Sequence, residues 1–174
     1  MEVKEAIRGR RSIRKFQERR IDDRLLVELV EAGTWAPTGG NAQTCVFIIV
    51  REPELIEKIK LISPGMLSFP AAIIAVCQDK EAAYEKGGEL GRDIMSIMDA
   101  ALASQNIMLL AFAEGVGSCP VLSFHRQGLQ RLLGLPEQVV PELLITLGYP
   151  AESPRPPERK LEGVYFFERY GQAG

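Results

Sequence analysis

Three arginines and a serine lie within five positions near the start of the chain, at Arg10, Arg11, Ser12 and Arg14. A guanidinium offers planar N–H forks that match the oxygens of a phosphate, and a hydroxyl adds one more donor. A solvated basic turn is the ordinary alternative for surface arginines. It is the weaker explanation here, because crowded guanidiniums repel one another when no anion lies between them. The cluster therefore predicts a phosphate-binding site.

Two further segments could bind a ligand. Residues 36–43 form a polar loop with two glycines, between an amphipathic helix and an apolar strand. Its asparagine and glutamine, Asn41 and Gln43, are also well explained as ordinary turn residues. Far downstream, residues 154–160 form a proline-stiffened basic tail. A planar cofactor that carries a phosphate could use all three segments.

Length and composition bound the class of protein. The 174 residues suffice for one domain with a sizeable core, and a hydrophobic share of 46% argues against a disordered chain. The formal net charge of -2 argues against a general binder of polyanions, so we expect no nucleic-acid partner. One histidine and three separated cysteines do not form a ligand set, and we expect no metal site.

The cysteines, the first residues and the apolar segments indicate the cellular compartment. Cys45, Cys77 and Cys119 lie in apolar surroundings, which is typical of buried thiols in a reducing environment. The first residues are charged, without an apolar leader. The longest apolar segment, 94–113, is interrupted by polar side chains near its middle, which disfavours a membrane span. We therefore expect a cytoplasmic protein that does not enter a membrane.

Hydrophobic periodicity predicts helices separated by strands, and hence an α/β or α+β sheet covered by helices. Residues 45–50 have the pattern of a strand buried on both faces, and the polar residues 84–91 that of a mobile loop. The tail has no core of its own, so a neighbouring subunit is its natural support, through an added strand around 164–167. The expected helices are 2–8, 22 to the residues before Pro37, 53–62, 92–114 and 126–133, and the expected strands are 45–50, 71–76, 116–122 and 142–147.

In this order and spacing, the motifs of the chain resemble those of the nitroreductase family of FMN-dependent oxidoreductases, over nearly the whole length. The resemblance implies an α+β fold with a mixed sheet flanked by helices. It also implies a single FMN-binding domain over 1–174, and a homodimer that exchanges the C-terminal extension 151–174. The motifs are Arg-Arg-Ser-x-Arg-x-Phe at 10–16, Ala-Pro-Thr-Gly-Gly-Asn-x-Gln at 36–43, Gly-Val-Gly-Ser at 115–118, Leu-Gly-Leu-Pro at 133–136, Leu-Gly-Tyr-Pro at 147–150, and Arg159.

The resemblance implies individual roles in cofactor binding. Arg10, Ser12 and Arg14 match positions that hold the FMN phosphate and ribityl chain, and Arg11 matches a position beside the flavin ring. The carboxamide of Asn41 offers a donor and an acceptor to the pyrimidine edge of the flavin. The remaining expected contacts are Pro37, Thr38 and Gln43 in the loop, Pro120, Val121, Leu122 and Ser123 along the flavin, and Arg159 and Lys160 in the tail, of which Arg159 returns to the phosphate.

The chain departs from the family pattern at two places. Gln43 is followed by Thr-Cys where Pro-Trp is typical, which removes a bulky aromatic residue from the pocket. Leu122 stands where many members carry glutamate, yet a backbone N–H of Leu122 or Ser123 can still be aimed at flavin N5.

Two other motifs have plainer explanations. Gly-Val-Gly at 115–117 follows a helix and Pro120 occupies the place of a third glycine, so the dinucleotide fingerprint is excluded. His125 stands at a predicted helix start without a nearby carboxylate, which is more typical of a capping or surface residue than of a catalytic one.

The resemblance implies an enzyme that uses NADH or NADPH to reduce nitroaromatics, quinones or similar flat electrophiles by ping-pong hydride transfer through FMN. No side chain is expected to act as acid or base. Phe69 and residues 84–89 are the expected acceptor side. Two alternatives stay open: a protein that binds or stores FMN without turnover, and a specialised flavin-dependent relative with a single substrate.

Overall fold

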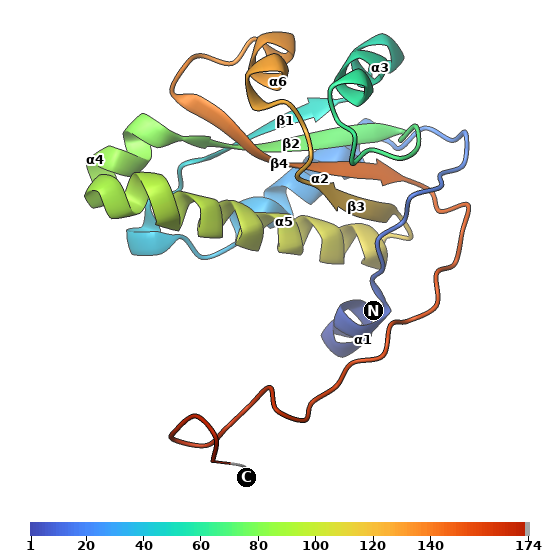
Figure 1. Ribbon diagram of the computed structural model, residues 1–174. Coiled ribbons are helices and arrows are strands. Elements are labelled where there is room, and N and C mark those ends of the chain that lie inside the picture. The colour runs from blue at the N-terminus through green and yellow to red at the C-terminus, as the bar shows by residue number, and fades with distance from the viewer. Residues whose placement is uncertain (173–174) are drawn as a thin grey trace.

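Four strands form one sheet in the computed structural model, which describes residues 1–172. The strand order is β1-β2-β4-β3, and all three neighbouring pairs are antiparallel. A parallel element is present only as the isolated bridge between Ser12 and Ser118. With helices on both faces, the fold is of the predicted α+β class (Figure 1). The strands are β1 (Cys45–Val50), β2 (Ala72–Asp79), β3 (Gly117–Val121) and β4 (Val139–Gly148).

Two pairs of helices cover the two faces of the sheet (Figure 1). Helices α2 (Asp23–Thr34) and α5 (Ser96–Ala113) pack on one face, and α3 (Pro53–Leu61) and α6 (Arg126–Leu133) on the other. The central strand β2 supplies both cores, because alternate side chains of a strand point to opposite faces. Its even-numbered residues 72–76 join the α2–α5 core and its odd-numbered residues 73–77 join the α3–α6 core.

Strand β1 was predicted at the right residues, and its side chains pack against the cores on both faces of the sheet, but their burial is less complete than predicted. Only Val50 is fully buried, and the other five residues are partly exposed. The reason is its place in the sheet: β1 pairs with β2 alone, and its outer edge carries no strand within residues 1–172. Local apolar runs do not reveal whether a strand lies at an edge.

The loop predicted at 84–91 is wrong, because residues 84–90 belong to α4 (Lys80–Leu90) and Gly91 begins the next helical turn. Asp79 caps this helix by accepting hydrogen bonds from the backbone N–H groups of Glu81 and Ala82. The two glycines do not end it: Gly88 takes φ 60° and ψ -150°, a kink that only glycine adopts easily. A π-helical turn, η2 (Gly91–Met95), then leads into α5, which therefore begins four residues later than predicted.

The helical stretch Lys80–Ala113 is long and apolar enough to cross a membrane by length and composition. Within the described fold its α5 part packs against α2 and the sheet, with Ile107 and Ala111 fully buried. This arrangement is typical of the core helix of a globular protein.

Both ends of the chain leave the sheet on the same side (Figure 1). Helix α1 (Val3–Gly9) precedes the basic cluster, and the 3-10 turn η1 (Gly39–Asn41) lies in the polar loop. The tail begins beside the N-terminal segment, where Ala151 N donates to Lys15 O at 2.9 Å, and then extends away from the sheet. It forms no helix or strand between residues 151 and 172, and the last two residues of the predicted extension lie outside the described chain. The added strand at 164–167 thus stays a prediction.

Candidate functional site

The basic cluster is held against the start of β3. Ser12 bridges Ser118, and the backbone N–H of Ile13 donates to Ser118 O at 2.9 Å. Close approach depends on Gly117, since a Cβ there would lie 2.9 Å from the side chain of Ile13. The segment 10–14 therefore follows β3 as a short extended stretch, with its donors beside the strand.

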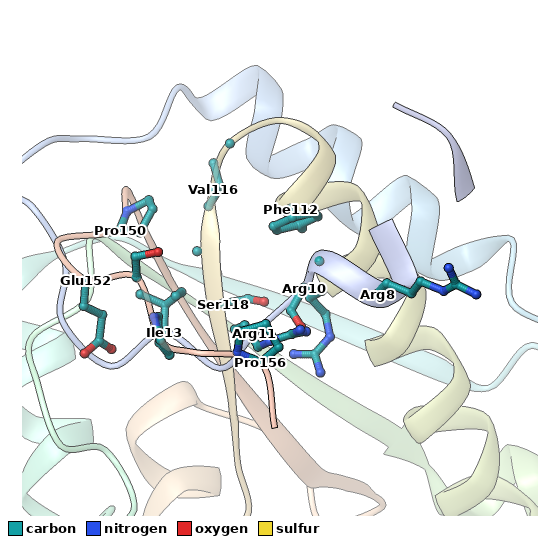
Figure 2. Close-up of a pocket in the computed structure, with 15 residues that line it drawn as sticks. Arg8, Arg10, Arg11, Ile13, Phe112, Val116, Ser118, Pro150, Glu152 and Pro156 are labelled. Carbon is teal, nitrogen blue, oxygen red and sulfur yellow. The ribbon is translucent and has the colours of Figure 1, made fainter. Parts of the chain in front are cut away.

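A cavity of about 470 Å³ lies between this segment, the end of α5 and the start of the tail. Figure 2 shows the side chains of Arg10, Arg11 and Ser118 gathered in it near Pro156, whereas Arg8 points away. The other lining residues are Gly9, Ile13, Phe112, Gly115, Val116, Gly117, Pro150, Glu152, Ser153 and Pro154.

Three buried donors in this cavity have no hydrogen-bond partner among the described residues: Arg10 Nη1, Arg11 Nε and Ser118 Oγ. A buried polar atom left unpaired costs about 1–3 kcal/mol. Two guanidiniums and a hydroxyl that converge without an acceptor are the donor set of an anion site. The residues present therefore fit a phosphate group. Of the three expected phosphate contacts, only Arg10 lines this cavity, and Ser12 and Arg14 do not. Arg11 was expected beside the flavin ring, and Ser118 was not predicted.

Glu152 fixes the tail to the basic cluster. Its Oε1 accepts from the backbone N–H groups of Arg14 at 2.5 Å and Lys15 at 3.1 Å. Glu152 was not predicted from the sequence, because its contact joins positions far apart in the chain and no local motif indicates it. Since the carboxylate takes two main-chain amides, the side chains of the cluster stay available for a ligand.

Arg14 and the end of β3 lie together. Arg14 lines a small space with Cys119, Val121 and residues 65–68. The predicted flavin contacts Pro120 to Ser123 thus neighbour the predicted phosphate contacts, and Ser123 O accepts from Gly65 N at 3.4 Å. Leu122 is 71% exposed at this end of the strand, so the position held by glutamate in many family members presents an apolar surface here.

The polar loop has an unusual backbone. Gly40, Asn41 and Gln43 have φ of 58°, 55° and 53°. Non-glycine residues are uncommon in this left-handed region, and those that do occur there are often found at ligand sites. Gln43 Nε2 donates to Asn41 Oδ1 at 2.9 Å, and the backbone N–H of Gln43 donates to Thr38 Oγ1 at 3.2 Å. The predicted contacts Thr38, Asn41 and Gln43 therefore form one locally ordered unit, which Pro37 precedes in the chain.

The loop and the basic cluster lie at opposite ends of α5. Gly39 N donates to Asp99, whereas Gly9 packs on Phe112 near the other end of the helix. At 1.5 Å per residue, these two points of α5 are roughly 20 Å apart. Arg159 and Lys160 are exposed, in the part of the tail that extends away from the sheet (Figure 1). Within one described chain, the three predicted segments do not converge.

The cysteines and the histidine have structural roles. Burial raises the pKa of the Cys77 thiol to about 12 and that of the half-buried Cys45 thiol to about 11, so neither supplies a thiolate at neutral pH. His125 Nδ1 accepts from the backbone N–H of Gly128 at 2.9 Å and caps α6, which confirms the capping interpretation. Residues 1–172 contain no group of three His, Cys, Asp or Glu side chains placed to hold a metal ion.

Comparison with known proteins agrees with the geometry. The model of the "Nitroreductase family" matches residues 7–67 and 60–149. A Methanothermobacter thermautotrophicus protein named as a candidate NADH dehydrogenase/NAD(P)H nitroreductase is 36% identical over an alignment of 160 residues that covers 88% of this chain and 80% of that protein. The FMN reductase (NADPH) of Bacillus subtilis is 25% identical over 182 residues, covering 95% of this chain and 73% of that one.

Solved structures share the fold. A candidate nitroreductase from Exiguobacterium sibiricum, crystallised in complex with FMN, has a TM-score of 0.84 at 20% identity and covers 97% of this chain and 98% of its own. The match to the family model spans most of the chain, and the Methanothermobacter relative has 36% sequence identity to it. The chain therefore belongs to the nitroreductase family of oxidoreductases.

Proposed function

We propose that the protein is an FMN-dependent oxidoreductase that uses NADH or NADPH to reduce nitroaromatics, quinones or similar flat electrophiles. The observation that carries the proposal is the set of unpartnered buried donors of Arg10, Arg11 and Ser118. These donors fit the phosphate of FMN, and relatives named as FMN reductase and NAD(P)H nitroreductase support the chemistry.

When bound, FMN supplies the redox chemistry, because its ring can accept and donate a hydride. The residues of the chain bind the cofactor and orient it. Arg10, Arg11 and the hydroxyl of Ser118 hold the phosphate end, so Arg11 takes a phosphate role in place of the expected position beside the flavin ring. Ser12, which bridges Ser118, is a further proposed phosphate contact. Asn41 offers a donor and an acceptor to the ring edge. The remaining proposed contacts are Arg14, Pro37, Thr38, Gln43, Pro120, Val121, Leu122 and Ser123, with Arg159 and Lys160 joining the phosphate from the tail.

We propose further that two copies of the chain complete each site. The outer face of α5 is apolar without a partner: Ile97, Met98 and Leu102 are between 45% and 59% exposed. A two-fold axis across the middle of α5 sets the Asp99 end of one helix beside the Phe112 end of its partner. The loop of one subunit then reaches the basic cluster of the other, which resolves the separation within one chain.

The free edge of β1 and the extended tail support the same dimer. An unpaired strand edge offers a row of backbone donors and acceptors that a strand from another chain can pair with. The tail carries an aromatic stretch at 164–167 that has no strand partner within residues 1–172. In the proposed dimer this stretch extends the partner's sheet at β1 and brings Arg159 and Lys160 to a phosphate site.

The proposed acceptor side is an apolar surface near the end of β3. It keeps Phe69 from the expected acceptor side, whereas the expected residues 84–89 lie in the polar helix α4. Leu122 and Leu67 are exposed near the end of β3, and Phe69 lies a short distance along the chain. His125, the single histidine, is occupied as a helix cap. Such a surface suits flat electrophiles that need contact area more than proton transfer. The protein is expected to work in the cytoplasm, where nicotinamide coenzymes are available.

The test is anaerobic reduction of the purified yellow protein with NADH and with NADPH, followed by a panel of nitroaromatic and quinone acceptors. The proposal expects the flavin absorbance to bleach and then to return when an acceptor is added. A protein that stores FMN would keep its absorbance in the presence of either coenzyme. A relative specialised for one substrate would bleach but fail with the whole panel.

A further inference from the structure

The loop 38–43 has three residues in the left-handed region, and one of them, Gln43, is of a type that does not favour it. Asn41 and Gln43 lie in the left-handed region with φ of 55° and 53°. Such residues persist only where the surroundings fix them. They are also the residues whose carboxamides are proposed to meet the cofactor. Hydrogen bonds within the loop order it locally. A contact from outside the loop is needed to fix its place on the fold.

That contact comes from Asp99 on α5. Its side chain is 5% exposed, and the backbone N–H of Gly39 donates to Oδ1 at 3.1 Å and to Oδ2 at 3.3 Å. No lysine, arginine or histidine lies within ion-pair distance of Asp99 in the described part of the chain. Burying a carboxylate without a cation is unfavourable unless hydrogen bonds compensate it. The loop amide is the compensation that the structure offers.

The contact is tight on both sides. Met95 lies one helical turn before Asp99, and a Cβ added to Gly39 would sit 1.8 Å from Met95 Cε. Side chains four residues apart share one face of a helix, so the methionine and the carboxylate form a floor under the loop. A side chain at position 39 would push the end of the Met95 side chain aside. The loop is thus seated on α5 rather than free at the surface.

We infer that Asp99 is a positioning residue: it holds the loop in the shape that presents Asn41 and Gln43 to the flavin. The inference rests on the proposed function. It assigns to a residue of α5, which does not itself touch the cofactor, control over the affinity of the site for FMN. Because the loop is proposed to serve the partner's site, the effect of Asp99 crosses the dimer interface.

Asp99→Leu removes the acceptor, Asp99→Asn keeps one oxygen but no charge, and Ser104→Ala is the matched control. Ser104 is buried on the same helix and donates to Ala100 O, away from the loop. Two quantities are measured on flavin-free protein: the dissociation constant for FMN, and the hydrogen-exchange rate of the Gly39 amide. We expect D99L to weaken FMN binding tenfold or more and to speed Gly39 exchange at least tenfold. D99N should shift both about threefold, and S104A neither.

Unchanged FMN affinity and Gly39 exchange in D99L would overturn the inference, as would an equal loss in S104A. If D99L does not fold, the test rests on D99N. Unchanged FMN affinity and unchanged Gly39 exchange in D99N would then contradict the positioning role of Asp99. If the wild-type protein binds no FMN, the proposed function fails. Protection of Gly39 by Asp99 is still decided in that case by the exchange measurement, so the two failures are distinguishable.

Discussion

Replacing Arg10 by alanine should change ligand binding and stability in opposite directions. The guanidinium Nη1 of Arg10 is buried in the candidate phosphate cavity without a partner. A hydrogen bond to a charged group contributes about 1.5–3 kcal/mol, so its loss should weaken FMN binding roughly 10- to 150-fold. In the flavin-free protein, the same change removes a donor whose burial costs about 1–3 kcal/mol. Part of that gain is offset by lost packing of the aliphatic stem. We expect the flavin-free variant to be at least as stable as the wild type.

The assay pairs FMN titration by flavin fluorescence with denaturant unfolding of the flavin-free protein. Arg8→Ala is the matched control, since Arg8 lines the same cavity but points away from it (Figure 2). The control should change both quantities little. Wild-type FMN affinity in R10A, or a flavin-free R10A clearly less stable than R8A, would refute the assignment of Arg10 to a preorganised anion site.

Three further predictions concern the core and the interface. Glu142 is buried 2.5 Å from the Lys80 ammonium and 2.9 Å from Arg126 Nη1, so Glu142→Ala should lower the free energy of unfolding by about 3–5 kcal/mol. Arg126→Ala, at a half-exposed partner, should cost less than about 1 kcal/mol, and equal losses in denaturant unfolding would contradict the difference. Burial raises the pKa of Cys77 from about 9 to about 12, so the unfolded state releases this proton first and stability should fall as pH rises above 9, a fall that Cys77→Ala should reduce. Ile97→Asp should yield a monomer by sedimentation that also loses FMN, and a monomer with full FMN would argue against a site shared by two subunits.

Most elements of the fold could be predicted because their apolar residues are periodic. The continuous apolar run 71–76 predicts a strand that is covered on both faces, and in the structure its side chains contribute to both cores. The kinked helix α4 was missed because its paired glycines have the composition of a loop, and only the backbone of Gly88 shows how the helix tolerates them. The partial exposure of β1 was missed because strand order depends on pairings between distant segments.

The candidate site also has parts that could be predicted from the sequence and parts that could not. The basic cluster and the polar loop are local motifs, and the sequence indicated both. Asp99 and Glu152 were missed, since each acts on a backbone segment 60 or more residues away. Their role is visible only once the fold brings those segments together. The separation of the loop and the cluster along α5 was also not predicted, because motifs do not state how far apart two segments lie in the fold.

The central claim, that two subunits build each FMN site, can be tested with mixed dimers. One subunit carries Arg10→Ala and Ser12→Ala, and the other carries Asn41→Ala and Gln43→Ala, with different affinity tags so that the mixed dimer can be purified. Each parent homodimer should bind little FMN. In the mixed dimer, one site would inherit both defects and the other none, so we predict about half of the wild-type FMN content. A mixed dimer as empty as its parents would mean that each site is built from a single chain, contrary to this account.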